Sequence, residues 1–200
     1  MLRAAFNRIK TSSAARTMST SAAEVTTYAQ SVSTFHWVVG GLMVGIVGTV
    51  KVAQDTTDKK KKGELMTLHK SLALIAAVLV PARIATRLAT RAPPALEGAL
   101  WEKYLGQASH LGLYGLMIGL PGSGIAMGYF SGFGLPFFGA KIPGAATPNK
   151  EISGSAYKAH KLMGQVLVYF IPLHVAGAFY HVAKGQKIFQ RINPFVKGTK

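Results

Sequence analysis

The sequence predicts an all-α integral membrane protein, a four-helix bundle of up-down-up-down topology. Only 15% of the residues are charged, whereas an ordinary soluble domain has about 25%. Lys, Arg, Asp and Glu are absent from four stretches, residues 36–50, 71–82, 105–140 and 162–183. Because a helix needs about 20 mainly apolar residues to cross a bilayer, we expect membrane spans at about 33–54, 65–88, 104–130 and 157–183.

The N-terminal residues 1–25 have a different composition from the spans. They carry four basic residues, and residues 1–23 contain no acidic residue; the basic ones are Arg3, Arg8, Lys10 and Arg16. Ser and Thr are frequent, and a long apolar core is missing, which is typical of a mitochondrial presequence rather than a secretory signal. A basic tail without regular structure is the alternative. We therefore expect a membrane domain at 26–195, in the mitochondrial inner membrane, and a short basic tail at 196–200.

The three connections between the predicted spans differ in character. The first is short and carries the basic run 59–62, and the second contains Pro93 and Pro94, which stop a helix. The third, about 131–156, is rich in Gly, Pro and Phe. Aromatic residues favour the membrane–water interface, so we expect an interfacial loop here, long enough to cover a binding site.

The charge and cysteine content exclude several classes of function. The formal net charge is +16, but the basic residues gather at span ends, where they meet anionic lipid headgroups. They form no separate basic domain, so nucleic acid is not an expected partner. Cysteine is absent, which excludes disulfides and metal sites held by thiolates.

The six histidines all lie inside or at the ends of the spans, and an ionisable side chain at that depth suggests a functional site. His160 and His174 share one helix face about 21 Å apart. With alternating span directions, His69 and His160 fall near one side of the membrane, side B. His36 falls near the side of the N-terminus, side A, within reach of either His174 or His181.

Facing imidazoles on separate helices are suited to axial ligation of haem iron. Zinc is a poorer candidate because it needs three or four ligands and the spans contain no carboxylate or thiol. Hydrogen bonds between helices are the simpler alternative for each histidine, and for His110 we prefer that alternative or contact with a haem edge. Cations for haem propionates are available in Lys70 and Lys161 on side B and in Arg83 on side A.

Small residues form a face on two of the spans. The glycines of this face are Gly40, Gly41, Gly45 and Gly48 on the first span and Gly112, Gly115, Gly119 and Gly122 on the third. Such a face allows close helix packing, or it leaves clearance for a flat macrocycle. The sequence leaves both interpretations open.

Several short motifs, in order, resemble those of the prokaryotic-type cytochrome b561 family over about residues 33–195. The motifs are His36-Trp37, Leu68-His69-Lys70, Arg91-Ala92-Pro93-Pro94, His110-Leu111-Gly112-Leu113-Tyr114, Leu120-Pro121-Gly122-Ser123-Gly124, His160-Lys161-Leu162 and Leu173-His174-Val175-Ala176. The presequence, the basic run 59–62 and the lengthened third loop depart from the family pattern and suggest an organellar setting.

The resemblance implies two b-type haems, one ligated by His36 and His174 and the other by His69 and His160. It also implies a quinone or substrate pocket, with ubiquinone as the candidate, near His181. The expected function is electron transfer between a small redox molecule, such as superoxide, and quinone or a protein partner. A quinone-linked oxidoreductase of the superoxide:ubiquinone type would be an enzyme. A haem-containing subunit of a mitochondrial respiratory complex is the alternative.

Overall fold

The computed structural model describes residues 27–196, so the predicted presequence and residues 197–200 lie outside the described part. The elements are α2 (Gln30–Asp55), α3 (Lys59–Ala89), α4 (Leu100–Phe130), β1 (Leu135–Phe137), β2 (Ala140–Ile142), α5 (Lys150–Ala183) and α6 (Ile188–Arg191). The predicted all-α fold class is confirmed, with one small β-hairpin added between α4 and α5.

The four long helices are apolar enough to cross a membrane, and they contain 26, 31, 31 and 34 residues. At a rise of about 1.5 Å per residue, each helix is longer than the roughly 30 Å thickness of a bilayer's hydrocarbon core. Few of their residues are buried inside the protein, which leaves long apolar outer faces for lipid. The chain is therefore a multi-pass membrane protein that lies in a lipid bilayer.

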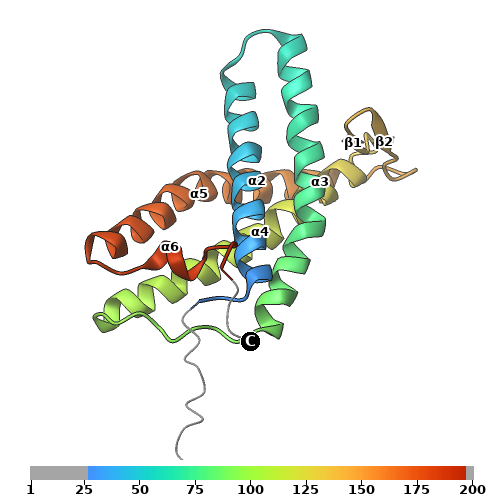
Figure 1. The fold of residues 1–200 in the computed structure, drawn as a ribbon. Coiled ribbons are helices and arrows are strands. Elements are labelled where there is room, and N and C mark those ends of the chain that lie inside the picture. The colour runs from blue at the N-terminus through green and yellow to red at the C-terminus, as the bar shows by residue number, and fades with distance from the viewer. Residues whose placement is uncertain (1–26, 197–200) are drawn as a thin grey trace, which may run out of the picture.

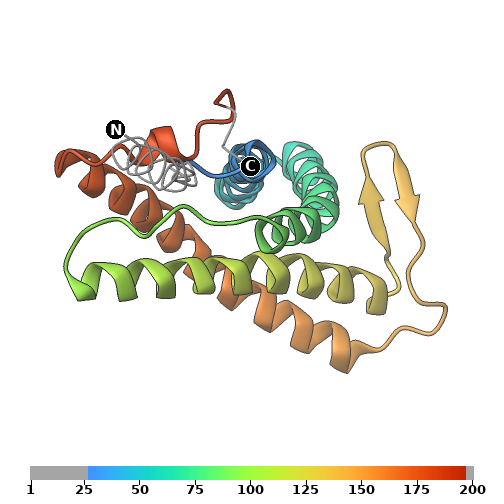
Figure 2. The same ribbon diagram turned by 60° about the horizontal axis from the view of Figure 1, so that its bottom comes forward.

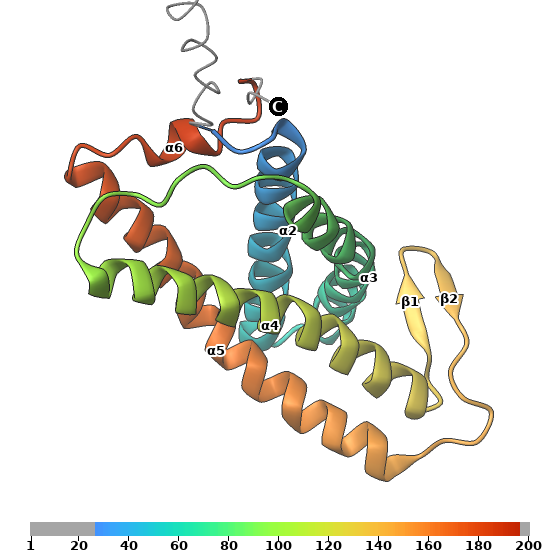
Figure 3. The ribbon, with the colours of Figure 1, turned by 90° about the horizontal axis from the view of Figure 1, so that it is seen from below.

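The helices form two antiparallel hairpins, α2 with α3 and α4 with α5 (Figure 1). The second hairpin lies across the first instead of running alongside it, as Figure 3 also shows. All four helices contribute to one core, whose buried residues are Val39, Met43, Ile46, Ala76, Val80, Met117, Leu120 and Leu167. The faces that carry the histidines meet around this core.

The first helical hairpin shows that the prediction of a loop at 59–62 was wrong. The four lysines form the first turn of α3, although cations are unfavourable at the positive end of a helix dipole. The carboxylate of Asp58 accepts hydrogen bonds from the backbone N–H groups of Lys60, at 2.8 Å, and Lys61, at 3.2 Å. This N-cap starts the helix earlier than its apolar pattern indicates.

The connection between α4 and α5 is more regular than its sequence suggests. Strands β1 and β2 pair antiparallel, with Phe137 opposite Ala140, and Figure 2 shows the β-hairpin beside α3. Phe138, in the tight turn, has a left-handed φ of 48°, and its N–H donates to the Ser71 hydroxyl at 2.8 Å. The β-hairpin is thus attached to α3. The predicted loop ends at residue 149, because the Asn149 side chain caps α5.

Candidate cofactor site

On side B, α3 and α5 bring two imidazoles face to edge across the bundle. The ring centres of His69 and His160 lie 6.4 Å apart, and the ring planes are 88° apart. His69 is one of only a few buried polar side chains among the described residues. We call these two residues the B pair, and they meet as the alternating span directions predicted.

Both rings of the B pair are oriented by backbone carbonyl groups of neighbouring helices. His69 Nδ1 lies 2.9 Å from the Ile46 oxygen of α2, and His160 Nδ1 lies 3.0 Å from the Leu120 oxygen of α4. A carbonyl oxygen only accepts, so Nδ1 must carry the proton in each ring. The unprotonated Nε2 remains available as a ligand, which is the arrangement that metal-binding histidines usually adopt.

On side A, three imidazoles gather instead of two. His36 of α2 and His174 of α5 have ring centres 6.1 Å apart, and we call them the A pair. His110 of α4 lies 5.4 Å from His174. The sequence left His174 and His181 as alternative partners of His36, and the structure places His174 there. The position of His110 beside the A pair was not predicted.

The spacing within both pairs suits a metal ion held between two rings. A metal–imidazole bond is about 2 Å long, and the ring centre lies about 1 Å behind its nitrogen, so ring centres on opposite sides of one metal are roughly 6 Å apart. The A pair and the B pair have this spacing. Among residues 27–196, no group of three or more His, Asp or Glu is placed to hold a metal ion.

A cation lies against the A pair. Arg83 Nη2 is 3.2 Å from His36 Nδ1, and Nη1 is 3.2 Å from the Met117 sulfur. The guanidinium also lies 5.8 Å from the centre of the Tyr114 ring. Within the described part of the chain, no carboxylate pairs with Arg83. A cation inside a membrane normally requires a partner of opposite charge, so this site is suited to a ligand that brings an anionic group.

Comparison with known proteins identifies the family. The family profile described as prokaryotic cytochrome b561 matches residues 27–194. The chain belongs to the prokaryotic cytochrome b561 family. A similar protein is cytochrome b561 homolog 1 of Escherichia coli (strain K12), with 29% identity over 89 residues, 44% of this chain and 48% of the relative. The chain thus spans about half the length of the curated relative that it matches.

Membership in the cytochrome b561 family makes a b-type haem the group to test against this geometry. The described residues fit such a group in three respects. Two pairs of imidazoles have the spacing of axial ligands, the rings of one pair are held with Nε2 free, and a guanidinium beside the other pair lacks an anion. Haem propionates are anionic groups of the required kind.

Close packing, one of the two purposes that the sequence left open, is shown for part of the glycine faces. A Cβ on Gly112 or Gly119 would come within 3.1 Å of Phe170 or 2.7 Å of Met163, so these glycines allow α4 and α5 to pack closely. In contrast, a Cβ on Gly40, one turn beyond His36, would meet nothing within 4 Å. Close packing therefore explains the glycines between α4 and α5, whereas the space at Gly40 adjoins the A pair.

The other predicted site residues, Lys70, Lys161 and His181, belong to neither the A pair nor the B pair. Lys70 and Lys161 follow the B pair in sequence, and neither side chain has a hydrogen bond or ion pair within residues 27–196. His181 lies near the C-terminal end of α5, where its Nδ1 is 2.6 Å from the Gln186 side-chain oxygen. It takes no part in the A pair, and its environment is the surface of side A.

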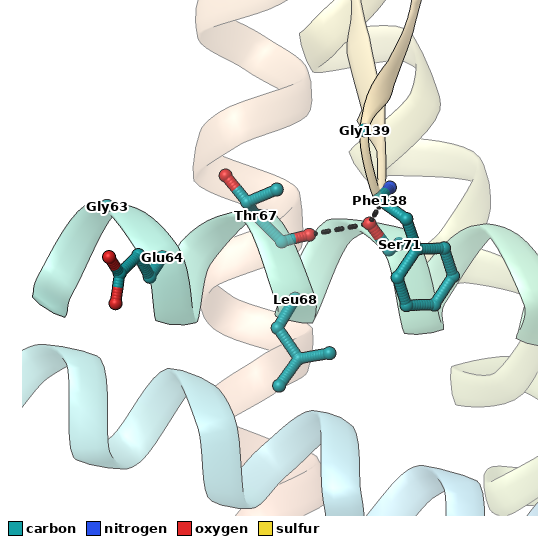
Figure 4. A pocket seen from close by; sticks show the side chains of 7 residues that line it. All are labelled: Gly63, Glu64, Thr67, Leu68, Ser71, Phe138 and Gly139. Atoms are coloured by element: carbon teal, nitrogen blue, oxygen red, sulfur yellow. Dashed lines mark hydrogen bonds between the residues drawn. The ribbon is translucent and has the colours of Figure 1, made fainter.

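A shallow hollow at the start of α3 is separate from the histidines. Figure 4 shows its lining from α3 and the β-hairpin, which consists of Gly63, Glu64, Thr67, Leu68, Ser71, Phe138 and Gly139. The Ser71 hydroxyl donates to the Thr67 oxygen at 2.8 Å and accepts from Phe138. These bonds attach the β-hairpin to α3, and no residue of either histidine pair lines the hollow.

Proposed function

We propose that this cytochrome b561 conducts electrons across the membrane through two b-type haems, one held by His36 and His174 and the other by His69 and His160. The observation that carries the proposal is the presence of two imidazole pairs with ring centres 6.1 and 6.4 Å apart. His160 and His174 lie on one face of α5, about 21 Å apart along the helix. Each pair therefore belongs to a different half of the membrane.

In this proposal the haem iron, when bound, supplies the one-electron redox chemistry, and the protein controls its surroundings. Ile46 and Leu120 hold the imidazoles of the B pair in one tautomer through their carbonyl groups. The apolar core of the four helices excludes water from between the pairs. Arg83 provides positive charge beside the A pair, where it would neutralise a propionate.

The decisive experiment is haem quantitation with a reduced-minus-oxidised spectrum on the purified full chain. We expect two b-type haems per chain, and a chain without haem would refute the proposal. His69→Ala and His160→Ala should each remove about one haem and spare the other, since each breaks only the B pair. His181→Ala is the control, because His181 lies outside both pairs. Retention of both haems in the B-pair variants would refute the pairing.

We further propose that the electrons pass from superoxide, or a similar small donor, to ubiquinone in the mitochondrial inner membrane. Two superoxide anions each lose one electron to form O₂, and ubiquinone takes up two electrons and two protons to form ubiquinol. On side A, His181 Nδ1 donates to the Gln186 side-chain oxygen at 2.6 Å, which leaves His181 Nε2 to accept the proton of a quinol hydroxyl. This assignment rests on the resemblance described above and on the partly exposed position of the two side chains.

Turnover by the isolated protein tests the proposed substrates. The purified chain in lipid should reduce a soluble ubiquinone analogue when superoxide is supplied, and His181→Ala should slow this step without loss of haem. A chain that contains haem, shows no turnover and co-migrates with a large complex on native gels would instead be a subunit of a respiratory complex.

A further inference from the structure

The C-terminal segment folds back across the side-A end of the bundle. After α5, the chain turns at Gly185, whose φ is 78°, and passes the α3–α4 connection and the start of α2 (Figure 3). The N–H of Tyr28 donates to the Arg191 oxygen at 2.9 Å, and the indole N–H of Trp37 donates to the Ile192 oxygen at 2.8 Å. Three segments that are distant in sequence therefore meet at one place.

A hollow lies where these three segments meet. Its lining consists of Thr27, Leu96, Lys187, Gln190 and Arg191. Four of these side chains are hydrogen-bond donors, two of them are cations, and the lining contains no carboxylate. One nitrogen of Arg191, Nη2, donates to the Pro94 oxygen, which fixes the guanidinium and leaves its other N–H groups for a ligand. The hollow is therefore suited to an anion.

The surroundings place this hollow at the surface of the membrane. It lies beside the first residues of α2 and beyond the last residues of α5. Phe189, in α6, stacks on Trp37 with ring centres 6.4 Å apart and packs edge-on against Phe179 at 5.8 Å. Aromatic side chains of this kind gather at the level of the lipid headgroups.

We propose that the hollow lined by Lys187, Gln190, Arg191 and Thr27 binds the phosphate of an anionic phospholipid. Cationic pockets between the ends of membrane helices favour anionic headgroups, and an Arg fork with a Lys matches phosphate oxygens well. Leu96 supplies an apolar wall on which the upper part of an acyl chain or glycerol can lie. The bound lipid connects the start of α2, the α3–α4 connection and the C-terminal segment.

The test uses the full-length protein in nanodiscs of phosphatidylcholine, with and without phosphatidylglycerol. We expect native mass spectrometry to show retained phosphatidylglycerol, and we expect Lys187→Gln combined with Arg191→Gln to lower that retention about ten-fold. The matched control is Lys141→Gln combined with Lys158→Gln, which removes the same charge from exposed positions elsewhere. An equal loss in the control would show nonspecific attraction and overturn the proposal.

Two further arms keep the proposal falsifiable. Arg191→Gln removes the bond to Pro94, so Lys187→Gln alone and Thr27→Val alone are measured as well, and each should weaken retention without unfolding the segment. Inorganic phosphate added to the nanodiscs should not displace the lipid. Displacement by millimolar phosphate would identify a site for free phosphate, and equal retention of both phospholipids would show that there is no anion site.

Discussion

His174 has two imidazole neighbours on side A, and only one of them has the spacing of a second axial ligand. His36 lies 6.1 Å from it, whereas His110 lies 5.4 Å away, measured between ring centres. A metal between two rings requires roughly 6 Å between their centres, so His36 fits better. His110 is then a neighbour of the ligand, placed to adjust its orientation.

We therefore expect His36→Ala and His110→Ala to have different effects. His36→Ala should remove about one haem per chain, whereas His110→Ala should keep both haems and change only the reduction potential or the spectrum of one. Haem quantitation and a redox titration measure the two effects. If His110→Ala removes a haem and His36→Ala does not, the assignment of the A pair is wrong.

Arg83 is the residue expected to adjust the potential of the haem on side A. A fixed positive charge beside a haem stabilises the reduced state, which carries one positive charge less. Arg83→Gln should lower that haem's potential by tens of millivolts, where about 59 mV is a tenfold change for one electron. The haem of the B pair should keep its potential and serves as the internal control in the same titration.

At the residue scale, the sequence predicts which histidines form pairs. It predicts less well which contacts orient their rings. Alternating span directions bring His69 to His160 because helix direction and depth follow from the order of the spans. The hydrogen-bond acceptors are the backbone oxygens of Ile46 and Leu120. The side chains of these two residues do not indicate this role in the sequence. The sequence does not predict the contact of His110 with His174, which depends on how α4 packs against α5.

Among the elements, the β-hairpin between α4 and α5 is attached to α3 by a hydrogen bond from Phe138 to Ser71. The left-handed φ of Phe138 costs roughly 1–2 kcal/mol for a residue with a side chain, and the 2.8 Å bond from its N–H to Ser71 offsets part of that cost. Ser71 is fully buried, so its hydroxyl cannot turn to water instead.

Ser71→Ala should therefore loosen the β-hairpin without disturbing the histidine pairs. We expect faster hydrogen exchange at the Phe138 amide and faster proteolysis within residues 131–149, with the haem content unchanged. Thr90→Val is the control, because the Thr90 hydroxyl bonds only within its own helix, to the Thr86 oxygen at 2.8 Å. Unchanged exchange at Phe138 would show that the bond to Ser71 does not hold the hairpin.

The elements also show why helix positions were predictable and helix ends were not. Long uncharged stretches require helices, since the backbone must satisfy its own hydrogen bonds in lipid. The ends depend on single capping residues, and Asp58 and Asn149 each start a helix before the apolar stretch begins. The β-hairpin escaped prediction because its turn has Phe138, and not Gly139, in the left-handed conformation.

Over the whole molecule, two hairpins that cross hold the two histidine pairs. Each pair takes one histidine from the first hairpin and one from the second, so neither hairpin alone can complete a site. The sequence predicts the two layers, since the depth of a residue follows from its place in a span. It does not predict the crossing, which depends on how the side chains of α3 fit against α4 in the common core.

The C-terminal segment connects the two helical hairpins on side A, in addition to the α3–α4 connection. Lys184 pairs with Glu102 at 2.6 Å, which raises the pKa of Lys184 above its usual value. Beyond it, Gln186 donates to the Glu97 oxygen at 2.6 Å, and the Ile192 oxygen accepts from Trp37, which directly follows His36. Hydrogen bonds contribute about 1 kcal/mol each, so the whole segment stabilises this end by a few kcal/mol.

Deletion of residues 186–200 should therefore weaken the A pair and leave the B pair intact. Without the segment, the start of α2 loses its bond at Trp37, and water reaches His36 and His174 more easily. We expect the truncated chain to lose one haem faster than the other on warming, as followed by the visible spectrum, whereas a chain that lacks only residues 197–200 should behave like the full protein. Equal loss of both haems would mean that the segment stabilises the bundle as a whole and not the site on side A.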